Sequence, residues 1–369
     1  MRTLLLATSF SPAVGGMETL LYQTMRRLAE PPLVVAPAQA PPPDVPVRGV
    51  RTTLAARAIY RPTWFLHPSL YYASAWLPVA LRAAREWRPR VVQIGHIYLA
   101  PLGWLLARRL GVPWLVYTYG QEVWRGGAPM GQQRLDRVLR GRALQQADAV
   151  LSPGTFTSGL LAEWGVRRER ITCVPYGAEP RPPSRPPVGQ TVLSVARLVP
   201  RKGIDTLIRA LARLPAVQYR IVGSGPEEAR LRLLAHSEGV ADRVTFLGRI
   251  DDARLAEEYQ RCALFALPAR RTADGQLEGY GLVHFEAAAW GRAVVAGRSG
   301  GEVDAVVDGE TGVLVDGESV EAVAEAIGGL LADPERLRRM GEAGRRRVEI
   351  SHNWSRAADV VDRVLEGLG

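Results

Sequence analysis

The sequence has no long apolar run and almost no cysteine. Its longest apolar stretches, such as residues 4–7 and 263–267, fall far short of the roughly 20 residues that span a bilayer. The N-terminus also lacks a basic segment followed by a long apolar one, so we expect a cytoplasmic protein that is not secreted. Cys173 and Cys262 lie far apart with no histidine cluster beside either, which indicates neither a metal site nor a structural disulfide.

Lysine and asparagine are almost absent as well. Of the 47 basic residues only Lys202 is a lysine, the other 46 being arginine, and Asn353 is the single asparagine. A bias of this kind throughout a chain indicates general replacement of lysine by arginine rather than a property of one binding site. Lys202 is therefore a candidate functional residue, because it was kept where almost every other lysine was replaced.

The net charge of +10 at pH 7 would suit nucleic acid or an anionic membrane surface as a partner. The arginines, however, occur as short pairs and triplets along the whole chain, mostly beside acidic residues, as on solvated helix faces. A nucleic-acid-binding module would instead cluster its basic residues among aromatic ones. We therefore expect no nucleic-acid partner, and an anionic membrane surface stays open beside general solubility.

Proline divides the chain into two halves. The segment 179–190 reads E-P-R-P-P-S-R-P-P-V-G-Q, and its prolines can neither continue a helix nor join a central strand. We therefore predict an N-terminal domain over residues 1–178, a linker over 179–190 and a C-terminal domain over 191–353. A second proline-rich stretch, residues 36–46, is expected to be a long loop inside the first domain.

Short apolar runs of β type alternate with amphipathic runs of helix length on both sides of the linker, which is the pattern of parallel sheets covered by helices. The predicted strands are residues 3–7, 33–36, 91–94, 114–117, 149–152, 171–174, 192–196, 219–222, 244–247, 264–267, 293–296 and 313–315. Asp205, Asp252 and the Asp333-Pro334 pair mark helix starts. The sequence therefore predicts an α/β protein with two facing, Rossmann-like, doubly wound parallel-sheet domains, which bind ligands at the carboxyl ends of their strands.

Two glycines, Gly15 and Gly16, follow the first predicted strand at the point where a helix begins near Met17. Glycine lets the backbone approach a ligand closely, and a helix N-terminus offers free N–H groups to an anion. A plain turn between strand and helix explains the glycines as well. This feature alone therefore leaves phosphate binding and a structural turn as alternatives.

A sharper candidate site follows the strand at 192–196. Arg197 stands at its carboxyl end, and the sequence L-V-P-R-K-G brings Lys202 to the start of a helix near Ile204. The guanidinium fork and the ammonium point charge suit two adjacent phosphates. The alternative is a pair of unrelated surface cations, and the retention of the only lysine at this strand end favours the functional interpretation.

A third candidate site follows the strand at 264–267. Glu278 and Glu286 flank seven residues, and a helix is expected to begin near Gly281, whose first N–H groups would favour an anion. Carboxylates are good acceptors for sugar or ribose hydroxyls. Glu286 is either a carboxylate on the helix surface or, because an apolar stretch follows it, one directed at a ligand. The sequence S-G-G-E at 299–302 is expected to add backbone donors.

Together these motifs resemble family 4 of the retaining glycosyltransferases, which have the two-domain GT-B architecture. The resemblance covers nearly the whole chain and rests on G-G-M-E at 15–18, R-L-V-P-R-K-G at 197–203, V-G-S-G-P at 222–226, F-L-G at 246–248, the segment 278–286 and G-E-T-G at 309–312. Within the family, residues 197–203 and 268–281 most resemble phosphatidylinositol-mannoside-type, GDP-mannose-dependent α-mannosyltransferases.

The resemblance implies roles for the candidate residues. Arg197 and Lys202 would bind the donor diphosphate. Glu278 would hold the donor sugar, and Glu286 the ribose. The other implied donor contacts are Gly15, Gly16, Gly223, Arg249, Ile250, Gly281, Leu282 and Val283. The final helix, within residues 354–369, would cross back onto the first domain.

The chain departs from the family pattern at Tyr119. The family usually has H-G-x-E or H-G-x-D there, whereas residues 119–122 read Y-G-Q-E. A tyrosine hydroxyl can form a hydrogen bond, but it cannot become a cation near neutral pH as histidine can. Tyr119 is therefore a candidate catalytic residue at the position of the usual family histidine. His96, which follows the strand at 91–94, is a candidate substitute for that histidine on the acceptor side.

The implied reaction is retaining transfer of a hexose, with mannose from GDP-mannose favoured, to an acceptor hydroxyl of a lipid or polyol. A UDP-sugar-dependent glucosyl- or N-acetylglucosaminyltransferase is the alternative within the family, and a sugar-nucleotide epimerase is the alternative outside it. Arg197, Lys202 and helix N-termini would stabilise the charge on the leaving diphosphate, so no protein nucleophile is needed. In the absence of a D-x-D triplet we expect no essential metal and no cofactor.

Aromatic residues are frequent in the segment 60–87: Trp64, Phe65, Tyr71, Tyr72 and Trp76. They would suit a membrane interface or a lipid acceptor, and a buried helical hairpin explains them equally well. The sequence therefore keeps open a peripheral location on the inner face of the membrane.

Overall fold

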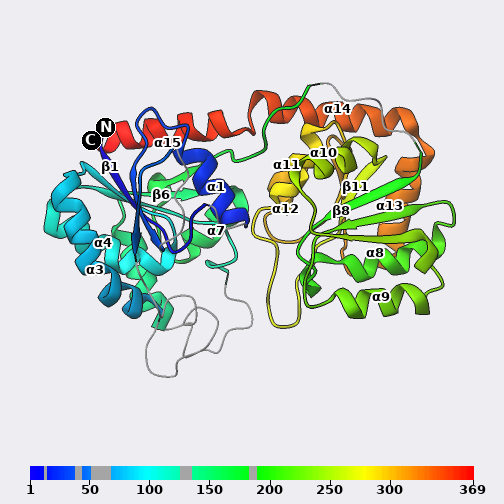
Figure 1. Ribbon diagram of the computed structural model, residues 1–369, viewed down its shortest axis with the longest axis horizontal. Coiled ribbons are helices and arrows are strands. Elements are labelled where there is room, and N and C mark those ends of the chain that lie inside the picture. Colours follow the sequence, from blue (N-terminus) through cyan, green and yellow to red (C-terminus); the bar gives the residue numbers. More distant parts are fainter. Residues whose placement is uncertain (12–14, 38–43, 51–67, 125–134, 183–188) are drawn as a thin grey trace. The chain divides into compact units, whose positions relative to one another are not determined.

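The computed structural model describes residues 1–11, 15–37, 44–50, 68–124, 135–182 and 189–369, and the chain forms two compact units (Figure 1). The first unit comprises Met1–Tyr176 and Trp354–Gly369, and the second comprises Gly177–Asn353. The first unit therefore ends two residues before the predicted end of the first domain at residue 178, and the second unit begins at Gly177 rather than after a separate linker.

The first unit contains a parallel sheet of seven strands in the order β3-β2-β1-β4-β5-β6-β7. Its strands are β1 Thr3–Leu6, β2 Leu33–Pro37, β3 Val47–Val50, β4 Val91–Ile94, β5 Trp114–Tyr117, β6 Ala149–Ser152 and β7 Ile171–Cys173. The central strands β1, β4, β5 and β6 are buried at every position, as expected for parallel strands covered on both faces. The sequence did not predict β3, which among the described strands pairs with β2 alone and reads V-R-G-V rather than a continuous apolar run.

Helices cover both faces of this sheet. They are α1 Gly16–Met25, α3 Pro68–Trp87, α4 Ala100–Leu110, α6 Arg142–Gln146, α7 Thr155–Glu163 and α15 Trp354–Leu368, with short turns η1 Ile97–Leu99, η2 Arg137–Gly141 and η3 Arg168–Arg170. Figure 1 shows α3 and α4 side by side on one face, and α15 on the other face, where it packs against α1. Asp362 of α15 accepts a hydrogen bond from the backbone N–H of Ala29 at 3.0 Å, which ties the last helix to the first unit.

Trp76 is the one aromatic side chain of the segment 60–87 singled out above that lies within the described side chains, and it is fully buried in the core of the first unit. Burial excludes Trp76 from a membrane interface. Trp64 and Phe65, and the side chains of Tyr71 and Tyr72, lie outside the described residues, as does most of the loop expected at 36–46. Within the described ranges, no helix has the length and apolar character needed to cross a bilayer.

The second unit contains a parallel sheet of six strands in the order β10-β9-β8-β11-β12-β13. Its strands are β8 Thr191–Val195, β9 Gln218–Val222, β10 Val244–Gly248, β11 Leu264–Leu267, β12 Val294–Gly297 and β13 Gly312–Val315. Its helices are α8 Ile204–Ala210, α9 Glu228–Ser237, α10 Asp252–Arg261, α11 Leu282–Ala289, α12 Glu302–Ala305, α13 Val320–Ala332 and α14 Pro334–Ile350, with short turns η4 Pro200–Lys202, η5 Leu211–Arg213 and η6 Ala241–Arg243. The predicted α/β class with two doubly wound parallel sheets is confirmed.

The predicted helix starts are accurate to within one residue, but only one of the three predicted aspartates caps its helix. Asp333 caps α14 and accepts a hydrogen bond from the N–H of Arg336 at 2.9 Å. At α10 the cap is Asp251, one residue before the predicted Asp252. Asp205 lies in the first turn of α8, and its carboxylate receives a side chain from a distant loop instead.

Candidate functional site

The candidate site of the second unit lies where β10, β9, β8 and β11 end. These four strands are neighbours in the sheet, and Arg249, Gly223, Arg197 and Glu278 follow them in turn. The carboxyl ends of parallel strands meet at one edge of a sheet, so the topology gathers the loops that the sequence predicted to bind a donor. Gly15, Gly16, His96 and Tyr119 belong to the first unit.

Lys202 and Glu278 form an ion pair at this edge. The Nζ atom of Lys202 lies 2.5 Å from Oε2 of Glu278, and the two side chains are 11% and 13% exposed. Burial raises the pKa of Glu278, but the ammonium of Lys202, aided by Arg201, more than offsets this and holds the pKa below its ordinary value. Lys202 was expected to bind phosphate and Glu278 to bind sugar, and the structure shows that the two side chains form an ion pair with each other.

Close backbone packing brings the two loops together. Gly203 has φ +67°, and a Cβ there would lie 1.9 Å from the carbonyl oxygen of Pro268, so only glycine lets the loop after β8 rest on the segment after β11. The guanidinium of Arg270 then reaches back to Asp205, with nitrogen-to-oxygen distances of 2.8 and 2.9 Å. The position of Lys202 against Glu278 is thus fixed from both sides.

Arg197 is exposed and forms no hydrogen bond or ion pair with any residue that the structure describes. It stands at the carboxyl end of β8 as a free guanidinium. On the next strands, Arg249 donates to the hydroxyl of Ser224 at 3.1 Å, and the N–H of Gly223 donates to the carbonyl of Gly248 at 2.8 Å. Ile250, which follows Arg249, is half-buried.

The helix α11 begins at this edge. Gly281 precedes it with φ +80°, and Leu282 and Val283 are its first two residues and are partly exposed. The first N–H groups of a helix have no partner within the helix, and the helix dipole favours negative charge there. The predicted helix start near Gly281 is confirmed, and this turn offers donors to an anion.

Glu286 is a partner of Tyr259, which the sequence analysis did not identify. The hydroxyl of Tyr259, a buried residue of α10, donates to Oε2 of Glu286 at 3.0 Å. Burial raises the pKa of Glu286, and the hydrogen bond from Tyr259 opposes that shift. Glu286 is therefore a half-buried, oriented carboxylate rather than a solvated one on the helix surface. Nothing in the sequence pointed to this role of Tyr259, because the helix pattern predicts that the side chain is buried but not which residue it contacts.

A hollow of about 400 Å³ adjoins these loops at the ends of β11, β12 and β13. Its charged lining includes Arg271, Arg298, Asp316 and Glu318, and Ser299 borders it from the loop after β12. The volume lies within the range of roughly 300–1,000 Å³ common to small-molecule sites. The second unit therefore has room for polar groups next to the loops that follow β11, β12 and β13.

In the first unit, His96 and Tyr119 lie together at the ends of β4 and β5, with ring centroids 6.3 Å apart. The hydroxyl of Tyr119 donates to the carbonyl of Gly95 at 2.7 Å, and Nδ1 of His96 accepts from the N–H of Tyr98 at 3.3 Å. Burial lowers the pKa of His96 to about 3 and raises that of Tyr119 well above its ordinary value. Both side chains are uncharged, so neither supplies the imidazolium that the usual family histidine could provide.

Glu122 is a residue of this loop that the sequence analysis quoted but did not assign. Its carboxylate accepts the N–H of Tyr119 at 2.6 Å and so closes the turn that carries the Tyr119 side chain. Gly15 and Gly16 stand where α1 begins, with Gly15 as the residue before its first turn. A Cβ at Gly15 would meet only the end of the flexible Glu18 side chain, and its backbone is extended, so the structure does not require glycine at this position.

Two family models match the chain. The model described as glycosyl transferases group 1 matches residues 179–347, and the one described as a glycosyl transferase 4-like domain matches residues 15–177. Together the two matches extend over almost all of both units.

Curated relatives extend over the same length. The GDP-mannose-dependent alpha-(1-6)-phosphatidylinositol monomannoside mannosyltransferase of Mycolicibacterium smegmatis is 33% identical over 99% of this chain and 98% of its own. The D-inositol 3-phosphate glycosyltransferase of Gordonia bronchialis is 31% identical over 94% of this chain and 82% of its own.

Among solved structures, sucrose-phosphate synthase of Thermosynechococcus elongatus superposes with a TM-score of 0.81 at 25% identity and covers 100% of this chain and 98% of its own. HepE of Anabaena, in complex with UDP, also has a TM-score of 0.81, at 19% identity, with 100% of each chain covered. These likenesses agree with the GT-B architecture that the motifs implied.

The Lys202–Glu278 pair predicts a pH dependence of stability. In Lys202→Met the carboxylate loses its cation, so burial raises its pKa above the value of about 4.3 of an exposed glutamate. With a raised folded-state pKa, the carboxyl group contributes its full stability below about pH 4.3, the pKa in the unfolded chain. It loses this stability as pH rises through the folded-state pKa. The wild-type carboxylate, with a lowered pKa, contributes stability above about pH 4.3 and loses it as pH falls.

Urea unfolding between about pH 4 and pH 8 measures the difference. We expect the free energy of unfolding of Lys202→Met to fall relative to wild type as pH rises. The double variant Lys202→Met/Glu278→Gln, which has no titrating group there, is the control and should lose this relative fall. A Lys202→Met profile parallel to that of wild type would show that the pair does not hold Glu278 ionised.

Proposed function

The chain belongs to the glycosyl transferases group 1 family and is a glycosyltransferase that uses a nucleotide sugar, and from this premise we propose that it transfers mannose from GDP-mannose to an acceptor hydroxyl. The observation that carries the proposal is a paired Lys202 and Glu278 beside an unpaired, exposed Arg197 at one sheet edge. The proposed cations for a diphosphate and the proposed carboxylate for a sugar hydroxyl thus lie on loops that follow the neighbouring strands β8 and β11. The epimerase alternative is set aside, because the relatives are named as transferases.

The proposed donor is GDP-mannose because the relative that matches 99% of the chain is named as GDP-mannose-dependent. The acceptor is proposed to carry an inositol phosphate group. One relative is named for phosphatidylinositol monomannoside and the other for D-inositol 3-phosphate, and both acceptors contain this group. If the acceptor is a lipid, the proposed location of the protein is an anionic membrane surface.

The proposed chemistry places charge stabilisation in the second unit. As the bond between the anomeric carbon and the phosphate oxygen breaks, negative charge develops on the leaving diphosphate. The free guanidinium of Arg197, the ammonium of Lys202 and the first N–H groups of α11 lie on loops at the edge where that charge would form. Preorganised donors of this kind need no rearrangement during the reaction.

The acceptor hydroxyl is proposed to attack the anomeric carbon on the face from which the diphosphate leaves, and its proton would pass to the departing phosphate. Transfer would then proceed with retention and without a protein nucleophile. Glu278 keeps Oε1 available for a sugar hydroxyl while Oε2 is bonded to Lys202. Glu286, held by Tyr259 through Oε2, can accept a ribose hydroxyl in the same way.

Turnover with defined substrates tests the proposed function. We expect purified protein to form a mannosylated product from GDP-mannose and a phosphatidylinositol mannoside, with the α configuration of the donor retained by NMR. We also expect EDTA to leave the rate unchanged, because the diphosphate charge is met by protein cations. Product from UDP-glucose or UDP-N-acetylglucosamine but not from GDP-mannose would favour the UDP-sugar alternative and contradict the proposed donor.

The variant Arg197→Ala tests the diphosphate role without disturbing the fold. Because the Arg197 side chain is exposed and unpaired within the described residues, we expect an unchanged free energy of unfolding. Loss of a charge-assisted contact should weaken GDP binding by about tenfold or more, measured by calorimetry. Arg336→Ala, which removes another exposed arginine, from α14, is the control. Equal GDP affinity in wild type and Arg197→Ala would reject the assigned role.

A further inference from the structure

A fully buried pair of ionisable side chains lies directly beneath the start of α11. The Nε2 atom of His284 is 2.7 Å from Oε1 of Glu302, and both side chains are 0% exposed. Within the described part of the chain, Nδ1 of His284 and Oε2 of Glu302 have no hydrogen-bond partner. Each buried polar atom without a hydrogen-bond partner lowers the stability of the fold. Such atoms are unusual in proteins and call for an explanation.

The environment keeps this pair uncharged. Burial lowers the pKa of His284 to about 3, and burial raises the pKa of Glu302 well above its ordinary value. Glu278 raises the pKa of both groups, and Lys202 lowers the pKa of both. The backbone N–H of Gly297 also lowers the pKa of Glu302. The hydrogen bond between Nε2 and Oε1 therefore joins a neutral imidazole to a neutral carboxyl group.

Gly281 rests on this pair. A Cβ at Gly281 would lie 2.6 Å from Cδ2 of His284 and 3.6 Å from Cγ of Glu302, so the turn that begins α11 is in contact with both side chains. His284 is the third residue of α11, and Glu302 is the first residue of α12. The pair thus joins the start of one helix to the start of the other.

The loop before α12 packs equally closely against the segment before α11. The N–H of Gly301 donates to the carbonyl oxygen of Glu278 at 3.1 Å. A Cβ at Gly300 would lie 2.0 Å from that same oxygen, and one at Gly301 would lie 2.0 Å from the carbonyl oxygen of Gly279. Backbone contact and the buried side-chain pair therefore clamp the same two segments together.

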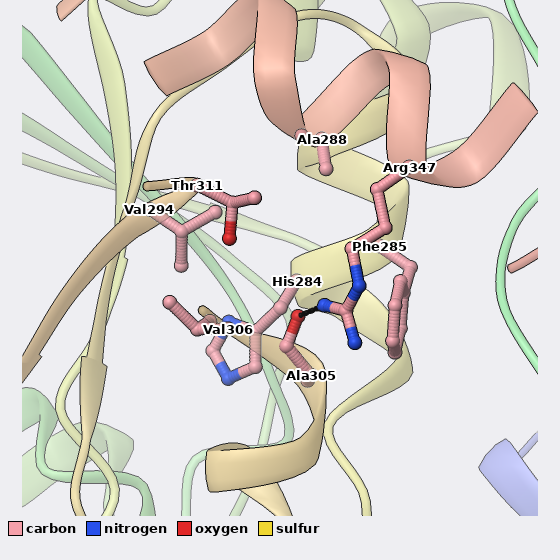
Figure 2. Close-up of a pocket in the computed structure, with 9 residues that line it drawn as sticks. His284, Phe285, Ala288, Val294, Ala305, Val306, Thr311 and Arg347 are labelled. Atoms are coloured by element: carbon pink, nitrogen blue, oxygen red, sulfur yellow. Dashed lines mark hydrogen bonds between the residues drawn. The ribbon is translucent and has the colours of Figure 1, made fainter. Parts of the chain in front are cut away.

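The space beside the imidazole is too small for a substrate. Figure 2 shows His284, Thr311 and Arg347 around a cavity, with a dashed line for the hydrogen bond from Arg347 to the carbonyl of Ala305. The cavity has a volume of about 10 Å³, close to the smallest volume, roughly 10–15 Å³, that holds one water molecule. A role for His284 and Glu302 must therefore act through the segments that they join.

We propose that His284 and Glu302 are positioning residues, whose hydrogen bond clamps the Gly281 turn against the loop at 299–302 and so fixes the α11 N–H groups that receive the donor diphosphate. The inference rests on the proposed function, because it assigns the diphosphate to the start of α11. Preorganised N–H groups stabilise a developing charge only when they are held in place, and a displacement of about 1 Å weakens them markedly. The pair supplies that restraint from inside the fold.

Three variants separate positioning from simple stabilisation. Glu302→Gln keeps a neutral hydrogen-bonding group at the same place and should preserve GDP affinity. Glu302→Ala removes the hydrogen bond and should weaken GDP binding by about tenfold, as expected for misaligned charge-assisted hydrogen bonds. The double variant His284→Leu/Glu302→Leu fills the space with apolar side chains, which often preserves stability, and it should show the same loss of GDP affinity.

Calorimetry with GDP and with GMP, which lacks the second phosphate, provides the decisive comparison. The loss should be large for GDP and small for GMP if the N–H groups of α11 receive the terminal phosphate. Asp333→Ala, which removes the N-cap of α14 in the same unit, is the control, because it lowers stability at the start of another helix and should leave GDP affinity unchanged.

Equal losses for GDP and GMP, or no loss in Glu302→Ala and the double variant, would overturn the inference. A loss in Glu302→Gln as large as in Glu302→Ala would overturn the claim that a neutral hydrogen bond at position 302 holds the turn. Should the double variant fail to fold, Glu302→Gln and Glu302→Ala decide between these outcomes. Wild-type protein that binds no nucleoside diphosphate would overturn the proposed function and this inference together, which distinguishes that failure from a failure of the inference alone.

Discussion

The ion pair between Lys202 and Glu278 is the interaction on which the candidate site of the second unit depends. Both groups are almost buried, so each is costly to hold as an ion without the other, and Glu278 stays ionised because Lys202 is 2.5 Å away. The pair can form only because Gly203 allows the loop after β8 to rest on the segment after β11. A site built this way holds its charges in place before any ligand arrives, which is the condition for stabilising charge that develops during a reaction.

Two kinds of buried polar pairing lie side by side in this unit. At the sheet edge the Lys202–Glu278 pair is charged, whereas beneath α11 the His284–Glu302 pair is neutral. The difference follows from the surroundings: a compensating ammonium is present in the first case, and desolvation acts with little opposition in the second. Tyr259 adds a third restraint by orienting Glu286. Glu278 and Glu286, which are proposed to contact the donor, are therefore held in place by neighbouring side chains of the same unit.

The sequence predicted the sheets well and the pairings poorly. Parallel strands buried on both faces are continuous apolar runs, so every predicted strand is present. In the parts of the chain that the structure describes, only the edge strand β3, which contains Arg48, was overlooked. Lys202 was found because the chain has no other lysine. Tyr259 and the His284–Glu302 pair were missed, because their roles depend on which helices meet in space. A histidine and a glutamate eighteen positions apart carry no signal of contact in a single sequence.

A calorimetric titration of the purified protein with GDP, UDP and ADP, followed by the sugar nucleotides of whichever base is preferred, tests the central claim most directly. The claim is that the sheet edge around Arg197, Lys202 and Glu278 binds the nucleoside diphosphate of a mannose donor. It predicts that GDP binds more tightly than UDP or ADP and that GDP-mannose binds more tightly than GDP. Preference for UDP would contradict the mannose donor, and no binding of any nucleoside diphosphate would contradict the site itself.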